Sequence, residues 1–160
     1  MGVVVILGVM AVVVAPSLQG VARSQQSGLI TEVERRLSHA RAHAMTTGEP
    51  SGVRIDVAGG EVSSLRIAAA GAAPTAIPDP TGAAGASLTT GSMMGGVGIS
   101  SFQNGDGGAN RQVIWFNYEG TPQTRQGDGT DPEAFTEDAV ITFPGGAQVF
   151  VRRVSGLIER

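Results

Sequence analysis

The chain has 160 residues, of which 41% are hydrophobic and 4% aromatic, and its formal net charge is −3. This length allows one domain with a real hydrophobic core plus an appendage. The chain has no cysteine, which excludes a disulfide framework and a thiolate metal site. All eleven basic residues are arginine. The net negative charge argues against a protein whose surface binds nucleic acid over most of its area.

The chain starts with the apolar run MGVVVILGVMAVVVA, which carries no charged or polar side chain and is followed directly by Pro16. Three interpretations are open. A cleaved secretory signal peptide would fit the apolar run, but a positively charged start and a good cleavage pattern are missing. A buried core strand or helix would also fit this length. The third interpretation is part of a membrane helix, since a complete span needs about 20 apolar residues.

The stretch after Pro16 favours the third interpretation. Its apolar residues recur at intervals of three and four, which is typical of an amphipathic helix. Gly48 and Pro50 supply a stop signal. Because the helical pattern resumes beyond Pro16, we predict one long helix that is kinked near that proline. The apolar stripe expected to pack on the domain consists of Leu29, Ile30, Val33, Leu37, Ala40 and Ala44.

The segment VVVILGVMAVVVAPSLQGVARS resembles the N-terminal helix of type IV pilins and type II secretion pseudopilins. In those helices a Val/Ile/Leu/Ala run contains a helix-interrupting Gly and ends near a Pro, the places that Gly8 and Pro16 take here. The family's processing motif of Gly, Phe, Thr, Leu, a hydrophobic residue and Glu is missing from this sequence. We therefore expect Met1 to be an internal methionine. The residues that the resemblance assigns to the membrane and to filament assembly are Val3, Val4, Val5, Ile6, Leu7, Gly8, Val9, Met10, Val12, Val13, Val14 and Pro16.

The next segment, LSHARAHAMTTGEPSGVRIDV, is similar to H-class minor pseudopilins and to related minor pilins of the FimT/FimU kind. There the helix ends in an Ala-Arg-x-x-Ala pattern, followed by a Gly-x-Pro turn and the first strand. The match is carried by Ala40, Arg41, Ala44, Gly48 and Pro50. The resemblance covers residues 1–67, and beyond them it extends only to the architecture.

The remaining chain is dominated by strand signals. GVRIDVAGGEVSSLRIA predicts a β-hairpin with a two-residue turn at Gly59 and Gly60. Residues 68–96 are rich in Ala, Gly, Pro and Thr without a period, which predicts a long surface loop or a partly disordered insertion. Further strands are predicted at VGISSF, QVIWFNY, AVITF and AQVFVRRV, and SGLIER predicts a short terminal strand or tail. Gly145 and Gly146 join the last two of the four strands as a second hairpin.

The predicted fold class is α+β, with one long N-terminal helix packed on a mainly antiparallel sheet. We expect residues 1–22 to form the membrane and assembly part of the helix. Residues 23–48 form its amphipathic part, whose exposed stripe needs a sheet as its partner. Residues 49–160 then form the β-sheet domain, including the loop at 68–96.

Two groups of residues have the types and spacing of metal ligands. His39 and His43 stand four apart on the helix, a spacing that places two imidazoles near one metal. No third ligand has a recognisable spacing, so we favour two surface histidines. The loops QNGDGGAN and RQGDGTDPEAFTED resemble calcium loops, with Asp128, Asp131 and Glu133 as candidate Ca²⁺ ligands. Neither loop fits the EF-hand pattern, and the alternative is a solvated acidic turn.

Arginines gather near the end of the sequence at Arg152, Arg153 and Arg160. Some FimT-like minor pilins bind DNA through C-terminal arginines, so the resemblance implies a candidate DNA contact here. Glu159 lies beside Arg160 and weakens this interpretation. The alternative is strand residues that face solvent. No nucleophile elbow or phosphate-binding loop is present in the sequence, and we expect no enzymatic activity and no required cofactor.

The resemblance implies a minor pseudopilin of a type II secretion system that acts in filament initiation and assembly. Its helix would anchor it in inner-membrane lipid and pack with the helices of other pseudopilins or pilins, with the domain in the periplasm. An inner-membrane assembly platform is a further expected partner. Two alternatives remain open at this point. One is a type IV minor pilin with a role in pilus assembly or DNA uptake, and the other is a secreted soluble β-domain with a cleaved signal.

Overall fold

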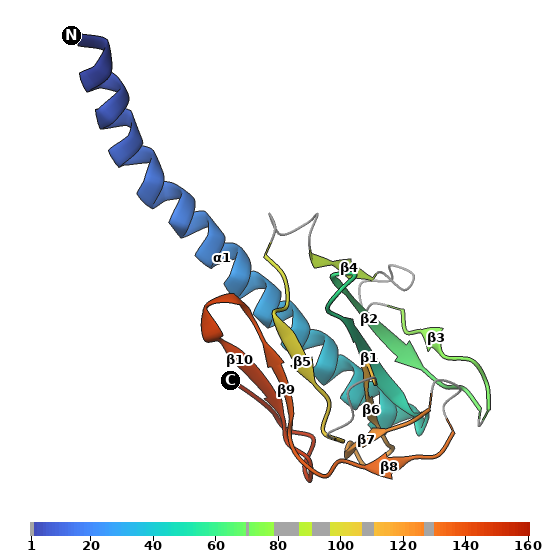
Figure 1. The fold of residues 1–160 in the computed structure, drawn as a ribbon. Coiled ribbons are helices and arrows are strands. Elements are labelled where there is room, and N and C mark those ends of the chain that lie inside the picture. Colours follow the sequence, from blue (N-terminus) through green and yellow to red (C-terminus); the bar gives the residue numbers. More distant parts are fainter. Residues whose placement is uncertain (1, 70, 79–86, 91–96, 107–110, 127–129) are drawn as a thin grey trace.

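The structure is a computed structural model that describes residues 2–69, 71–78, 87–90, 97–106, 111–126 and 130–160, with side chains from residue 23 onward. A continuous helix, α1 (Gly2–Thr47), takes up 46 residues and runs through Pro16 without a break. At 1.5 Å per residue it is about 69 Å long. Its N-terminal half extends beyond the strands and its C-terminal half lies along them (Figure 1). The predicted single long helix is confirmed.

The end of α1 is set by its local chemistry. Gly48 adopts a positive φ of 75°, which glycine tolerates at low cost, and its N–H donates to the Ala44 carbonyl oxygen at 2.9 Å. The Thr47 hydroxyl donates to the His43 carbonyl oxygen at 2.7 Å. These bonds satisfy carbonyls that the helix leaves without partners, and Pro50 then starts the path into the first strand.

Within the described part of the chain, seven strands form a first sheet and four form a second. The first sheet has the order β3-β2-β1-β6-β7-β8, with β4 also paired to β2, and the second has the order β11-β10-β9-β5. The strand pairs among the described residues are antiparallel, in agreement with the predicted mainly antiparallel sheet. The strands of the first sheet are β1 (Ser51–Asp56), β2 (Glu61–Arg66), β3 (Thr75–Ala76), β4 (Leu88–Thr89), β6 (Val113–Phe116), β7 (Pro122–Thr124) and β8 (Glu133–Ala134). Those of the second are β5 (Ser101–Gln103), β9 (Ala139–Thr142), β10 (Gln148–Val151) and β11 (Ile158–Glu159), with the 3₁₀ turn η1 (Pro144–Gly146) between β9 and β10.

The predicted hairpins are present, with a difference in the first turn. β1 pairs with β2 from Ser51↔Arg66 to Asp56↔Glu61, so the turn spans residues 57–60 and not Gly59 and Gly60 alone. The longer turn is closed by Asp56, whose Oδ1 accepts a hydrogen bond from the Gly59 N–H at 2.9 Å. The second hairpin turns through η1, which contains Gly145 and Gly146.

Four short strands lie where none was predicted. β3 and β4 fall inside the expected loop at 68–96, and both pair with β2. Part of that loop, residues 70, 79–86 and 91–96, lies outside the described residues. β7 and β8 extend the first sheet past β6. Strands of two or three residues are too short to show a period-two pattern, and their neighbours in the sheet determine their conformation.

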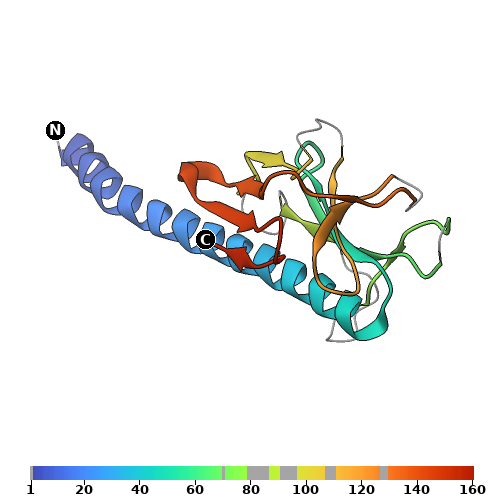
Figure 2. The same cartoon turned by 90° about the horizontal axis from the view of Figure 1, so that it is seen from below.

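The main hydrophobic core lies between α1 and the two sheets, which cover the same side of the helix (Figure 2). The six stripe residues of α1 are all buried in this core, at 0–7% exposure. They pack with inward-facing residues of both sheets, including Ile55 and Ile114 from the first and Ile141 and Val149 from the second. A second, smaller cluster contains Leu65, Ile67 and Trp115. Because neighbouring strand residues face opposite sides, Trp115 lies on the face of the first sheet that points away from α1.

Candidate functional site

The N-terminal half of α1 is the first candidate site. Its backbone is helical from Gly2 through the whole apolar run, and the side chains of residues 1–22 lie outside the described part of the structure. Of the residues that the structure describes, none forms a helix with the length and apolar character required to cross a bilayer. The N-terminal half of the helix extends clear of the sheets (Figure 1).

The C-terminal half of α1 is fixed to the domain by arginines as well as by apolar packing. Arg36 is only 8% exposed, and it donates from Nε to Glu32 Oε1 at 2.8 Å and from Nη1 to the Val62 carbonyl oxygen at 3.5 Å. Hydrogen bonding from Arg35 is the main cause that holds the pKa of Glu32 below its ordinary value, and Arg36 adds to it against the effect of burial. The buried guanidinium thus has both a carboxylate and a carbonyl partner on the inner side of the helix.

The two histidines lie at the junction of α1 with the first sheet. Their ring centroids are 6.4 Å apart in an edge-on arrangement. His43 Nδ1 lies 2.9 Å from Ser51 Oγ, and Ser51 donates to the Glu49 carbonyl oxygen at 3.1 Å. Burial is the main cause that lowers the pKa of His43. His43 therefore serves as a link between the helix and β1 in this structure.

The candidate calcium ligands are only partly described. Asp128 lies outside the described residues. Asp131 accepts a hydrogen bond from Gln126 Nε2 at 2.9 Å, and Glu133 pairs with Arg111 Nη1 at 3.2 Å. Among the residues that the structure describes, no group of three or more His, Cys, Asp or Glu side chains is placed to hold a metal ion. Strand β8 takes up part of this acidic segment.

Each of the three candidate DNA-contacting arginines has a partner within the structure. Arg152 pairs with Asp138 at 2.7 Å and with Glu159 at 2.6 Å. Arg153 Nη1 donates to the Thr136 carbonyl oxygen at 2.7 Å. Arg160 pairs with Glu34 of α1 at 2.8 Å. Two of the three guanidiniums are thus neutralised by carboxylates, which removes much of the charge that would attract phosphate.

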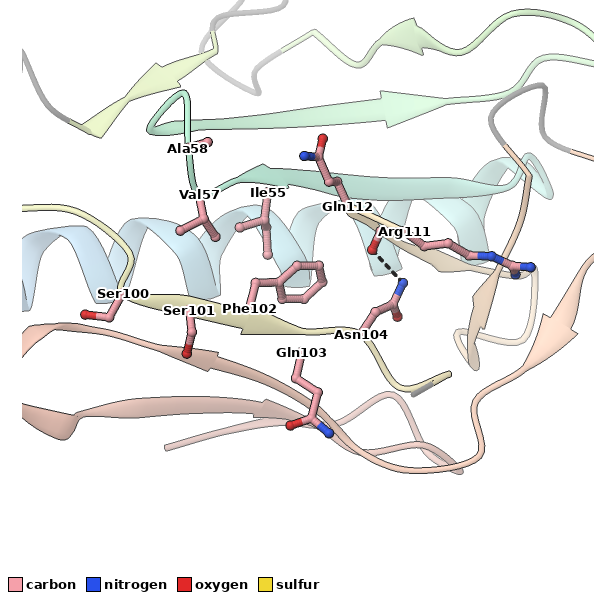
Figure 3. Close-up of a pocket in the computed structure, with 10 residues that line it drawn as sticks. All are labelled: Ile55, Val57, Ala58, Ser100, Ser101, Phe102, Gln103, Asn104, Arg111 and Gln112. Atoms are coloured by element: carbon pink, nitrogen blue, oxygen red, sulfur yellow. Dashed lines mark hydrogen bonds between the residues drawn. The ribbon is translucent and has the colours of Figure 1, made fainter. Parts of the chain in front are cut away.

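A groove that the sequence does not predict lies between the two sheets (Figure 3). It has a volume of about 580 Å³ and is lined by Ile55 of β1, by Gln112 just before β6, and by Phe102 and Gln103 of β5. Asn104, 4% exposed, donates from Nδ2 to the Arg111 carbonyl oxygen at 2.9 Å, the dashed line in Figure 3. Its Oδ1 is buried and has no partner among the described residues. The groove joins three distant segments, so no local pattern marks it.

A long helix laid along two antiparallel sheets, with its first half free of the domain, can be compared with known structures. The minor pseudopilin EpsH from the Type 2 Secretion System of Vibrio cholerae is similar, with a TM-score of 0.56 over 84% of this chain and 94% of that chain. The fold is pilin-like. The two sequences are 16% identical, so the similarity extends to the fold. No protein-family model and no curated protein sequence matches the chain.

The pilin-like fold explains the unequal halves of α1. Residues from Leu29 onward contribute to the domain core, whereas the preceding half reaches past η1, the nearest turn of the second sheet. Gln26 Nε2 donates to the Pro144 carbonyl oxygen and so marks where the domain begins to cover the helix. The C-terminal half of α1 is thus packed in the domain core, and the N-terminal half is available for other contacts.

Proposed function

We propose that the protein is a filament subunit of the minor-pseudopilin kind, held in the bacterial inner membrane with its β-sheet domain in the periplasm. The observation that carries this proposal is the division of α1 into a half buried in the domain core and a half that extends clear of it. In a secreted monomer this half of the helix would stand in water. In a filament subunit it can enter lipid or a bundle of like helices. Its role is mechanical, and no catalytic step is required.

The composition of the free arm supports this proposal. Residues 2–22 contain no Asp, Glu, Lys or Arg, and the first charged side chain is Arg23. The Val, Ile, Leu, Met and Ala side chains that dominate this segment are stable in hydrocarbon, where a helix satisfies its own backbone hydrogen bonds. The boundary at Arg23 would place the membrane surface just before the part of α1 that packs on the domain. We propose residues 1–22 as the membrane and assembly segment on this basis.

In assembly the same arm would leave the bilayer and pack with the helices of neighbouring subunits, on an inner-membrane platform. We favour a type II secretion pseudopilus, in which this subunit acts in initiation, because the similar solved structure is named a minor pseudopilin of such a system. A type IV minor pilin would use the same arm in the same way. The secreted alternative predicts a soluble protein whose arm is removed.

The absence of cysteine from the sequence provides a clean test of the proposed location. Val9→Cys and Thr89→Cys each introduce one thiol, the first in the arm and the second on the exposed edge of the domain. In cells with a permeabilised outer membrane, a membrane-impermeant maleimide should label Cys at 89 and spare Cys at 9. Both variants should stay in the membrane pellet after an alkaline wash. Release of both variants as a shortened soluble protein would support secretion and contradict the proposal.

A further inference from the structure

A second hollow lies on the face of the first sheet that points away from α1, and Arg111 and Gln112 line both this hollow and the groove between the sheets. Its volume is about 430 Å³, and Arg54, Arg111 and Arg125 line it together with Trp115 and Val113. We call these five residues the arginine hollow. Its three arginines come from β1, the residues before β6, and the residues after β7.

The three arginines of the hollow differ in the groups that surround their positive charges. Arg111 lies 3.5 Å from Asp106 and 3.2 Å from Glu133, so two carboxylates share its charge. Arg54 is exposed, and no hydrogen bond or ion pair joins its side chain to another described residue. Arg125 is half-buried, and burial lowers its pKa, which means that its charge is poorly solvated. With its amide turned so that Oε1 faces Arg125, Gln123 accepts from Nε and Nη2 at 2.7 and 2.8 Å. Arg54 is thus a cationic donor at the hollow that an added anion would stabilise.

The floor of the hollow is apolar. Trp115 is 2% exposed and packs with Leu65, Ile67 and Val113 in the smaller hydrophobic cluster. An anion attached to an apolar body can therefore place the body on Val113 and Pro74, which are the partly exposed apolar residues of the hollow, and its charge between the guanidiniums. A long polyanion would bind less tightly than a single carboxylate. The exposed Glu133 carboxylate lies at the same rim, and the chain as a whole is negatively charged. Both features favour a single compact negative charge.

We propose that the arginine hollow binds a carboxylate carried beside an apolar side chain, in an acidic segment of a partner protein. Guanidinium and carboxylate match in two parallel hydrogen bonds, and this pairing is stronger where water is partly excluded. The site goes beyond the proposed filament role and stands on the first sheet alone. If the hollow does not bind the peptide, the proposed membrane location of α1 is therefore unaffected. If α1 does not lie in the membrane, the proposed binding site is likewise unaffected.

The single tryptophan of the chain gives this site its own reporter, because Trp115 forms the floor of the hollow. The full chain in a nonionic detergent is titrated with acetyl-Phe-Glu-amide while tryptophan fluorescence is recorded. Acetyl-Phe-Gln-amide is the matched neutral probe. We expect a saturable change with the Glu peptide and an apparent affinity about tenfold weaker with the Gln peptide, since one charge-assisted contact is lost.

Variants assign the effect to the arginines. Arg54→Ala and Arg125→Gln should each weaken binding of the Glu peptide about tenfold. Arg23→Ala removes an exposed arginine far from the hollow and should leave binding unchanged. If Arg125→Gln fails to fold by circular dichroism, Arg54→Ala alone decides, because Arg54 is exposed. Equal binding of both peptides, an unchanged affinity in Arg54→Ala, or a response to a single-stranded oligonucleotide but not to the peptide would each overturn the proposal.

Discussion

The Arg41 side chain of α1 donates from Nε to the Gly120 carbonyl oxygen at 3.1 Å. The same guanidinium donates from Nη2 to the Ser155 carbonyl oxygen at 2.9 Å. Gly120 belongs to the turn between β6 and β7 of the first sheet, and Ser155 to the turn between β10 and β11 of the second. One side chain therefore connects the helix to both sheets at the end of the domain farthest from the free arm.

Replacement of Arg41 should loosen this connection. We expect Arg41→Ala to lower the free energy of unfolding by about 1–3 kcal/mol, because two carbonyls lose a charged donor and the aliphatic stem no longer packs. Denaturant unfolding of the full chain in nonionic detergent measures the change. Arg35→Ala is the control, since Arg35 is exposed and pairs with Glu32 within the helix. Its cost should be about 0.5 kcal/mol or less, and equal costs in the two variants would argue against the connection.

The stability of the domain should depend on the protonation of His43. Burial lowers the pKa of His43 from its ordinary 6.5, and the charges of Arg66 and His39 add to this while that of Glu49 opposes it. The unfolded chain then binds more protons than the folded one near that pH, so stability is full above it and is lost as the pH falls. Unfolding measured from about pH 5 to pH 7.5 should show this slope.

Two substitutions test the assignment to His43. His43→Gln should flatten the slope over this range, and His39→Gln should keep most of it. A slope of the same size in His43→Gln would place the titrating group elsewhere. Stability that rises on acidification would contradict the direction of the shift itself.

Replacement by alanine should change the free energy of unfolding in opposite directions at two glycines. Gly28 lies in α1, and a Cβ added there meets no atom within 4 Å. Gly28→Ala should raise the free energy of unfolding by about 0.5–1 kcal/mol, since alanine is the better helix former. At Gly52 of β1, an added Cβ would overlap the Ile114 carbonyl oxygen and lie 2.9 Å from Trp115 Cε3.

Gly52→Ala must therefore push β1 away from β6 or displace the tryptophan. We expect a loss of about 1–3 kcal/mol, in the range of overpacked cores. Thermal unfolding of both variants beside the unaltered chain reports the two signs. A neutral result at Gly52 would mean that the close contact between β1 and β6 relaxes without cost.

The protein should bind DNA weakly if at all. Arg152 and Arg160 are paired with carboxylates, and Arg153 donates to a main-chain carbonyl. We expect no saturable binding of a duplex oligonucleotide at low salt, measured by fluorescence anisotropy with the full chain. Tight, salt-dependent binding that Arg152→Ala and Arg153→Ala abolish would restore the DNA-uptake alternative.

The fold was predictable where it follows from local periodicity. The apolar stripe from Leu29 to Ala44 indicates a helix because one face repeats every 3.6 residues, and the hairpin of β1 and β2 follows from alternation on both sides of a glycine turn. The split into two sheets was not predictable. It depends on which strands pair across long distances, as β1 does with β6.

The candidate sites were less predictable than the fold, for a related reason. The arginine hollow joins residues 54, 111 and 125, which no spacing rule connects. Arg41 belongs to the helix-end pattern in the sequence. Its partners are main-chain carbonyls, and residue types do not indicate which carbonyls lie nearby. The arginines near the end of the sequence resembled a cationic cluster, and the sequence could not reveal that Asp138 and Glu34 lie against two of them.

Site-specific photo-crosslinking tests directly whether subunits assemble through the free arm of α1. Benzoylphenylalanine is incorporated at Val13 in the arm and, as a matched control, at Thr89 on the domain, and the cells are irradiated during active assembly. We expect adducts from position 13 to proteins that have an apolar N-terminal helix of the same kind, with the link mapped to that helix. Position 89 should give no such link. Adducts from position 13 to lipid alone, under conditions where filaments form, would contradict the claim.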